Sequence, residues 1–124
     1  MPSRLLSLVV ALILAQWAIA AGAQTKKEAK AAVSPAMGDA KVEVYKRIGD
    51  VALNIYIYTP KDHKPSDNRP AIVFFFGGGW VGGTPSQFRP HAEYLASRGM
   101  VAMAADYRVS SRHKTSPFEC VEDG

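Results

Sequence analysis

The sequence predicts an α/β fold in which an N-terminal β-hairpin precedes a parallel β-α-β crossover. Apolar and polar residues alternate with period two on both sides of Gly49 and Asp50, as expected for a hairpin. Further along, the continuous apolar run AIVFFF at 71–76 and a second predicted buried strand, MVAMAADYR at 100–108, flank a helical segment. Continuous apolar runs are typical of parallel strands that are buried on both faces and joined by a right-handed crossover.

The first 23 residues predict a signal peptide. Arg4 precedes an apolar run that ends near Ala20, and the small residues AGA at 21–23 provide a cleavage site. We expect cleavage after Ala23, which makes the mature protein secreted or periplasmic, with no stable membrane anchor. The alternative is an uncleaved anchor, because the apolar run is nearly long enough to span a bilayer.

Residues 24–40 are small, polar and charged, and they predict a flexible linker. Residues 41–124 then belong to one domain, because a chain of 124 residues has room for no more. In this part the hairpin ends at Pro60, and the proline-bounded segment KDHKPSDNRP at 61–70 forms a polar loop.

The crossover helix has recognisable start and stop signals. TPSQ at 84–87 predicts a capping box with proline at the first helical position. Pro90 predicts that this first turn is short and that the main helix starts near it, and Gly99 is a good C-terminal stop. The strand at 101–105 is expected to be central in the complete sheet. Because its next partner strands are absent from this sequence, we expect it to expose an unpaired apolar edge.

Composition excludes several classes of protein. The formal net charge of +4 comes from scattered Lys and Arg residues, so nucleic-acid binding is not expected. One cysteine, Cys120, cannot form a disulfide framework, and it is expected to be a small buried residue near a helix start. The histidines, His63, His91 and His113, lack metal-ligand spacing, and a Cys120–His113 pair has no supporting motif. We therefore expect neither a metal nor a cofactor.

Five glycines and one tryptophan follow the first apolar run within seven residues. A first interpretation is dinucleotide binding, because Gly77, Gly79 and Gly82 match G-x-G-x-x-G. Asp106 closes the next strand, where the motif has an acidic residue. Against this, TP at 84–85 starts the helix beyond the last glycine, whereas pyrophosphate needs the helix N-terminus at the glycines.

A second interpretation of the glycines is an oxyanion loop. Acyl transfer from an ester passes through a tetrahedral oxyanion, and one backbone N–H that points at this oxygen is worth about a hundred- to a thousand-fold in rate. Glycine allows the close approach, because no Cβ stands between the backbone and the reacting carbonyl. The loop also follows a parallel strand at its carboxyl end, where open α/β sheets place their sites.

The segment FFFGGGWVGG resembles the His-Gly-Gly-Gly-Trp loop after the third strand of α/β-hydrolase esterases of the hormone-sensitive-lipase and acetyl-esterase type. Two flanking segments extend the likeness. LNIYIYTP at 53–60 is similar to the family's second strand, and HAEYLASRGMVAMAADYRVS at 91–110 is similar to its first helix, fourth strand and Asp-Tyr-Arg turn. The likeness covers residues 42–124, and it implies an α/β-hydrolase fold and a small-molecule ester substrate.

Carried over position by position, the resemblance implies that the backbone N–H groups of Gly78 and Gly79 are the oxyanion donors. It also implies that Gly77 shapes the turn and that Trp80 braces the loop. Phe76 stands where the family usually has a histidine that holds the loop by a hydrogen bond. Phenylalanine cannot make that bond, whereas the backbone donors survive the change. The residues matching the Asp-Tyr-Arg turn are expected to be structural: Asp106, Tyr107 and Arg108.

The end of the sequence predicts an incomplete domain. In SPFECVEDG at 116–124, Ser116, Pro117 and Glu119 form a second capping-box pattern. The acidic residues suit the positive start of a helix dipole rather than its end. We therefore expect an α/β-hydrolase fold truncated at the start of a second helix.

No G-x-S-x-G motif for a nucleophile occurs in the sequence. The resemblance therefore implies that the catalytic serine, acid and histidine are encoded downstream, and that this chain alone is inactive. We expect the N-terminal fragment of a secreted carboxylic-ester hydrolase that supplies the oxyanion loop. The alternative is a non-catalytic secreted α/β module, or a decayed remnant, that keeps the loop as a structural turn.

Overall fold

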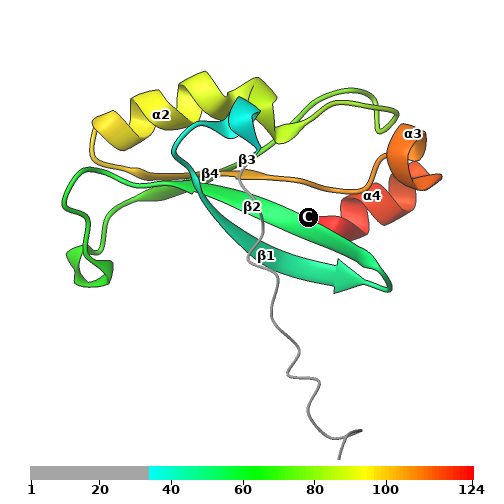
Figure 1. The fold of residues 1–124 in the computed structure, drawn as a ribbon, viewed down its shortest axis with the longest axis horizontal. Helices are drawn as coiled ribbons and strands as arrows, with labels where there is room; N and C mark the ends of the chain where they lie inside the picture. The colour runs from blue at the N-terminus through cyan, green and yellow to red at the C-terminus, as the bar shows by residue number, and fades with distance from the viewer. Residues whose placement is uncertain (1–33) are drawn as a thin grey trace, which may run out of the picture.

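The computed structural model describes residues 34–124 (Figure 1). The predicted signal peptide, its cleavage site and most of the predicted linker lie outside the described residues. One sheet has the order β1-β2-β4-β3, in which only β3 and β4 are parallel. Its strands are β1 (Lys41–Ile48), β2 (Val51–Tyr58), β3 (Ala71–Phe75) and β4 (Val101–Ala105). The predicted hairpin and parallel crossover are both confirmed, and they share one mixed sheet.

The hairpin of β1 and β2 turns at Gly49, whose φ of +56° lies in the left-handed region that a tight hairpin turn requires. A register shift between Val44 and Lys46 interrupts the pairing on β1. The polar loop that follows the hairpin contains a 3-10 turn, η2 (Pro65–Asp67).

The central strand is β4, as the sequence predicts, but its edges are not free. It pairs with β2 on one side and with β3 on the other. The prediction of an unpaired edge at 101–105 is therefore wrong, because the edge belongs to β3. The prediction that residues 71–76 form a strand buried on both faces is also wrong. Burial along β3 alternates between half-buried and exposed, because a helix covers only one of its faces.

Helix α2 (Arg89–Ser97) lies over that covered face and follows a 3-10 turn, η3 (Pro85–Phe88) (Figure 1). The predicted start near residue 90 is confirmed, and so is the stop at Gly99, which has a φ of +98°. The predicted capping box at 84–87 is wrong. Thr84 makes no side-chain cap hydrogen bond, and the side chain of Gln87 reaches the glycine loop instead.

Two short helices follow β4. The first is helix α3 (Ser110–His113). Helix α4 (Pro117–Asp123) starts with the predicted capping box, in which the backbone N–H of Ser116 donates to Glu119 Oε2 at 2.8 Å. Both helices lie at the end of the sheet to which the loop after β3 runs (Figure 1).

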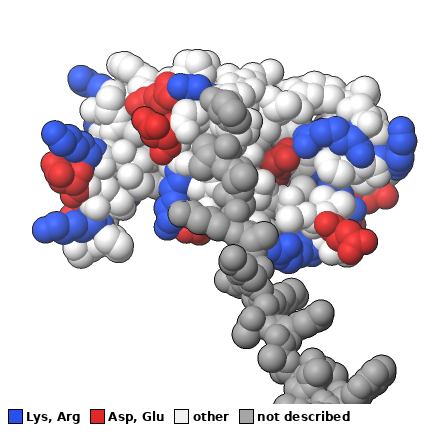
Figure 2. Space-filling view, viewed as in Figure 1, with Lys and Arg blue, Asp and Glu red and all other residues white. Residues whose placement is uncertain are grey.

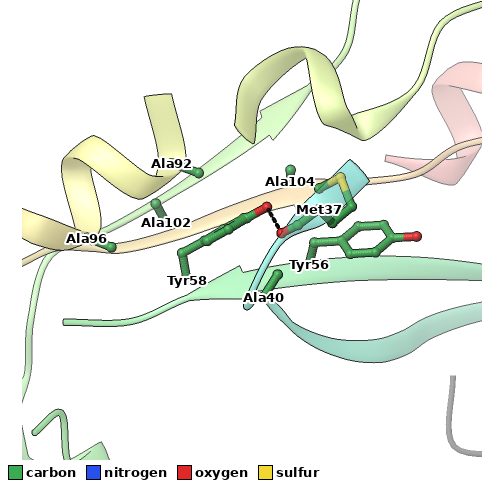
Figure 3. Packing of buried hydrophobic residues seen from close by; sticks show 8 residues of the cluster. All are labelled: Met37, Ala40, Tyr56, Tyr58, Ala92, Ala96, Ala102 and Ala104. Carbon is green, nitrogen blue, oxygen red and sulfur yellow. Dashed lines mark hydrogen bonds between the residues drawn. The ribbon is translucent and has the colours of Figure 1, made fainter. Parts of the chain in front are cut away.

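The main core lies between α2 and the sheet (Figure 3). Small residues from α2 face small residues from β4, which lets the helix lie close to the sheet. The side of this core is closed by two tyrosines from β2 and by the segment that precedes β1. Its buried members are Met37, Ala40, Tyr56, Tyr58, Ala92, Ala96, Ala102 and Ala104.

Residues 34–40 belong to this core, unlike the flexible linker that the sequence predicts there. They include a 3-10 turn, η1 (Pro35–Met37). Met37 and Ala40 are buried, and the Tyr58 hydroxyl donates to the carbonyl oxygen of Met37 at 2.8 Å (Figure 3). Burial of Met37 and Ala40, together with the hydrogen bond from Tyr58, attaches this segment to the sheet.

Charged side chains are mixed in sign over the face seen in Figure 2, where basic and acidic groups alternate in small clusters. Within residues 34–124, no helix is both long and apolar enough to cross a bilayer.

Candidate active site

The loop after β3 is a tight turn with an unusual backbone. Gly78 has a φ of +148°, and the next two residues, Gly79 and Trp80, have φ values of +59° and +62°. The N–H groups of Val81 and Gly82 donate to the carbonyl oxygen of Gly78 at 3.1 and 3.3 Å. Positive φ at both central residues of a turn is costly for a bulky side chain, so Trp80 holds local strain of about 1–2 kcal/mol.

Glycine is favoured at Gly78 and at Gly79 for different physical reasons. A Cβ on Gly78 would lie 2.0 Å from the carbonyl oxygen of Gly82, so no side chain fits there without opening the turn. A Cβ on Gly79 would meet nothing within 4 Å, so the backbone angle alone favours glycine at that position.

Hydrogen bonds to two other segments hold the loop. The N–H groups of Ser110 and Ser111, at the start of α3, donate to the carbonyls of Trp80 and Val81, each at 3.0 Å. The backbone N–H of Gly77 donates to Gln87 Oε1 at 2.7 Å. These bonds fix the loop on both sides of its tip.

The tip of the loop keeps unused donors. No acceptor among residues 34–124 pairs with the backbone N–H of Gly78 or of Gly79. Both residues are exposed, so these N–H groups are open to solvent or to a ligand. Two adjacent free donors on a fixed backbone are what the stabilisation of an oxyanion requires.

Phe76 supports the loop by packing rather than by a side-chain hydrogen bond. Its side chain is buried and stacks on Tyr107 with 4.1 Å between ring centroids. The Tyr107 hydroxyl donates to the carbonyl oxygen of Phe76, and burial raises the pKa of that phenol. The Arg112 guanidinium lies 5.9 Å from the Phe76 ring centroid, within range of a cation–π contact. Phe76 and Tyr107 form a second, smaller cluster of buried side chains together with Val109 and Cys120.

An apolar pocket of about 410 Å³ opens beside the loop. Aromatic side chains from β3, the loop and the Asp-Tyr-Arg turn form much of its wall, and α4 closes one side. Its lining residues are Phe75, Phe76, Gly77, Gly78, Gly79, Trp80, Tyr107, Cys120, Val121 and Gly124. The structure therefore brings the predicted loop residues 76–80 together around one cavity. Trp80, which is 47% exposed, stands at its rim.

Asp106 is occupied by a structural ion pair. Its two carboxylate oxygens accept hydrogen bonds from Arg112 at 2.8 and 3.1 Å, and one of them also accepts the N–H of Tyr107. A carboxylate held in this way is not free for a ribose hydroxyl. The 3-10 turn that separates the glycines from α2 likewise keeps the helix N-terminus away from them. Both features argue against dinucleotide binding.

A buried ion pair fastens α4 beside the site, and sequence reasoning missed it. The side chain of Asp123 is fully buried and accepts bonds from Arg108: the backbone N–H and Nε at 2.9 Å, and Nη2 at 2.9 Å. Burial alone would raise the pKa of Asp123, but the bonds from Arg108 outweigh it and hold that pKa below its ordinary value. The signal in the sequence was an acidic residue that is too late in α4 to serve the helix dipole.

His91, His113 and Cys120 make structural contacts. His91 packs edge-on against Phe88, and His113 Nδ1 accepts the backbone N–H of Val109 at 3.1 Å. The Cys120 thiol donates to the carbonyl oxygen of Ser116 at 3.2 Å, so it is not paired with His113. Across residues 34–124, no group of three or more His, Cys, Asp or Glu side chains is placed to hold a metal ion.

The mixed sheet, its crossover helix and the loop with free donors define an esterase-type α/β hydrolase. The sequence profile of the Carboxylesterase family matches residues 15–111, and this chain belongs to that family. It is 31% identical over 86 residues to Lipase 4 of Diutina rugosa, a match that covers 66% of this chain and 16% of the lipase.

Solved structures of a thermophilic esterase agree with this assignment. Esterase 2 of the planctomycete Thermogutta terrifontis is 62% identical, with a TM-score of 0.68, in its native and propionate-bound forms. The same esterase is also known phosphorylated by paraoxon. The propionate-bound match covers 70% of this chain and 32% of the esterase, so the chain spans about a third of that relative. The α/β-hydrolase fold and the esterase resemblance predicted from the sequence are confirmed.

Proposed function

We propose that residues 76–80 supply the oxyanion loop of a carboxylic-ester hydrolase whose nucleophile, acid and base lie in polypeptide outside residues 1–124. The observation that supports this most is the pair of free N–H groups on Gly78 and Gly79. They sit on a backbone held from both sides by α3 and Gln87, beside an apolar pocket. No serine, histidine and carboxylate of residues 34–124 are hydrogen-bonded into a catalytic triad.

The chemistry follows from charge development on the substrate. When a nucleophile adds to an ester carbonyl, the carbonyl oxygen becomes an oxyanion, and the N–H groups of Gly78 and Gly79 donate to it. These bonds are stronger to the oxyanion than to the neutral carbonyl, so they raise turnover more than they tighten substrate binding. The backbone donors need no reorganisation, because the turn and its anchors already hold them.

The proposed substrates are small-molecule esters of short carboxylic acids. The pocket next to the donors is apolar and small, which suits a short acyl chain rather than a charged group. The structures of Thermogutta terrifontis esterase 2 with propionate and with butyrate support the same acid length. No metal or cofactor takes part in the proposed reaction.

We also propose that the protein is exported, through the predicted signal peptide at residues 1–23. The charged start, apolar run and AGA site support this. Intact-mass measurement of the exported protein tests it. A product that starts at Gln24 agrees with the proposal, and a product retaining residues 1–23 in the membrane fraction contradicts it.

A single-chain chimera tests the proposed role of the loop. Residues of this chain replace the matched third of Thermogutta terrifontis esterase 2, and hydrolysis of p-nitrophenyl butyrate is followed. Gly78→Ala should lower kcat by about a hundred- to a thousand-fold with little change in KM, because the turn opens and the donors leave the oxyanion. The matched control is Gly49→Ala, which also adds a Cβ at positive φ, but in the β1–β2 hairpin turn, where that Cβ meets nothing within 4 Å.

Two results would overturn the proposal. One is a chimera whose turnover is unaffected by Gly78→Ala. The other is an equal loss of turnover in Gly49→Ala, which would mean that glycine replacement acts on folding alone.

A further inference from the structure

The glycine loop, residues 77–83, closes on itself so that its two ends lie in contact. The backbone N–H of Gly82 donates to the carbonyl oxygen of Gly78 at 3.3 Å. Gly83 has a φ of +110°, and a Cβ there would lie 2.5 Å from the carbonyl oxygen of Gly77. A displacement at the closing end of the loop therefore also moves its start, where the proposed oxyanion donors lie.

Each end of this loop has a polar anchor. At the start, Gln87 Oε1 accepts the N–H of Gly77. At the closing end, Nη2 of Arg112 lies 3.5 Å from the carbonyl oxygen of Gly83 and 3.4 Å from that of Tyr107. The Arg112 guanidinium therefore joins the closing end of the loop to the turn that follows β4.

Asp106 fixes the direction of this guanidinium. Its two carboxylate oxygens accept Nη1 and Nη2 of Arg112 at 3.1 and 2.8 Å, which is the two-pronged geometry of a guanidinium on a carboxylate. Asp106 is itself tied to the hairpin strands. Its N–H donates to the carbonyl oxygen of Asn54 in β2 at 2.8 Å, and its own carbonyl oxygen accepts the Tyr45 hydroxyl at 2.6 Å. The carboxylate thus sets the place of Arg112 relative to the sheet.

The helix that carries Arg112 depends on side-chain contacts for its position. Helix α3 has four residues, too few to be stable through its own hydrogen bonds. Its first two N–H groups donate to carbonyl oxygens in the middle of the glycine loop. Loss of the bonds between Arg112 and Asp106 therefore loosens the middle of the loop together with its closing end.

We propose that Arg112 is a positioning residue for ester hydrolysis, which transfers the position of Asp106 to Gly83 and so to the oxyanion donors. Arg112 does not line the apolar pocket. Together with Asp106 it borders a separate cavity of about 180 Å³, so it acts through the loop rather than on the substrate. The inference rests on the proposed function, because it names the side chain that keeps the N–H groups of Gly78 and Gly79 in place.

Arg112→Lys in the single-chain chimera separates loop position from stability. Lysine keeps a positive charge beside Asp106, but one ammonium group cannot replace the fork that reaches both the carboxylate and the carbonyl of Gly83. The urea midpoint should change little, because an ion pair remains. With p-nitrophenyl butyrate, kcat should fall at least about fivefold at nearly constant KM, since a misplacement of about 1 Å can cost about a hundredfold in rate.

Arg89 offers a matched control on α2. Its guanidinium also bonds a carboxylate, Glu93 Oε1 at 2.7 Å, and a backbone carbonyl of another segment, that of Ala36 at 3.3 Å. The side chains of Arg89 and Arg112 are 36% and 38% exposed. Arg89→Lys therefore weakens bonds of the same kind where they hold the segment before β1, and kcat and KM should both be unchanged.

Amide exchange of the same chimera follows the loop without any catalysis. The amides of Val81 and Gly82 both donate to the carbonyl oxygen of Gly78. In Arg112→Lys they should exchange at least about threefold faster, because the loop opens locally more often. They should not change in Arg89→Lys, and the amides of β1 should not change in either variant.

Three results would overturn the role of Arg112. The first is an unchanged kcat in Arg112→Lys although Gly78→Ala lowers it. The second is unchanged exchange at Val81 and Gly82, which would mean that Arg112 does not hold the loop. The third is an equal loss of turnover in Arg89→Lys, or equally faster exchange in β1, since the effect would then be a general loss of stability.

The proposed function would fail in a different way. If Gly78→Ala leaves turnover intact while Arg112→Lys still speeds exchange at Val81 and Gly82, then Arg112 holds the loop but the loop has no oxyanion role. If Gly78→Ala lowers kcat and Arg112→Lys changes neither kcat nor exchange, the oxyanion role stands and the positioning role of Arg112 is refuted.

Discussion

Replacing Asp123 by asparagine should lower the free energy of unfolding more than the removal of any exposed charge does. The Asp123 side chain is fully buried, and Arg108, which is 14% exposed, donates to both of its oxygens from Nε and Nη2. Asparagine keeps the shape but removes the charge, and its amide nitrogen faces a guanidinium. Removing one partner of a buried ion pair leaves the other without compensation, which costs about 3–5 kcal/mol.

The assay is urea unfolding of the 124-residue chain followed by circular dichroism. The matched control is Glu43→Gln, the same chemical change in an exposed pair. Lys41 Nζ lies 2.6 Å from Glu43 Oε1, but the two side chains are 71% and 50% exposed. Exposed pairs contribute about 0–1 kcal/mol, so this variant should unfold almost as the unmodified chain does.

The effect of Asp123→Asn should depend on pH in a defined direction. Because the folded-state pKa of Asp123 is lowered, its contribution to stability is complete above the ordinary aspartate pKa of about 3.9. The contribution is lost as pH falls below that value. The difference between the chain and Asp123→Asn should therefore be constant from pH 5 to 7 and shrink below pH 4. A difference under about 1 kcal/mol at pH 7, or equal to that of Glu43→Gln, would refute the role given to this pair.

Three further outcomes are expected. In the esterase chimera, Gln87→Leu should lower kcat several-fold at nearly constant KM, because the N–H of Gly77 loses its acceptor. Gln87→Glu keeps an acceptor oxygen and should keep most of the turnover. Steady-state kinetics of the two variants test this expectation. Gly79→Ala should cost about 1–2 kcal/mol of stability, since its Cβ meets nothing, and should retain far more activity than the clashing change at Gly78. The 124-residue chain alone should hydrolyse no p-nitrophenyl acetate above background, and turnover that disappears when one serine or cysteine is mutated would contradict this.

Local patterns in the sequence were sufficient for the hairpin, the crossover and the α4 capping box. Alternation fixes which face of β2 is buried, and Gly49 and Gly99 stand where positive φ is needed. These features depend on residues close in sequence, so propensity and periodicity carry them. The tight loop after β3 was also predicted, because a run of glycines after an apolar strand indicates positive φ or close approach of the backbone.

Features that depend on contacts between residues far apart in the sequence could not be predicted from local patterns. Which strand forms the edge is decided by β2 pairing with β4 rather than by the residues of β3 themselves. The role of Gln87 was misassigned because a local capping box and a bond to Gly77 compete for one side chain, and the turn geometry favours the second. The bond between Asp123 and Arg108 joins residues 15 positions apart through a turn that periodicity does not describe.

The placement of the oxyanion donors can be measured directly. The single-chain chimera is inhibited with paraoxon, which is known to phosphorylate Thermogutta terrifontis esterase 2, and its crystal structure is determined. The phosphoryl oxygen stands in for the oxyanion of ester hydrolysis. We predict that it lies about 2.7–3.1 Å from the backbone nitrogens of both Gly78 and Gly79. A phosphoryl oxygen beyond hydrogen-bond distance of both nitrogens, held instead by other groups, would contradict the oxyanion role of this loop.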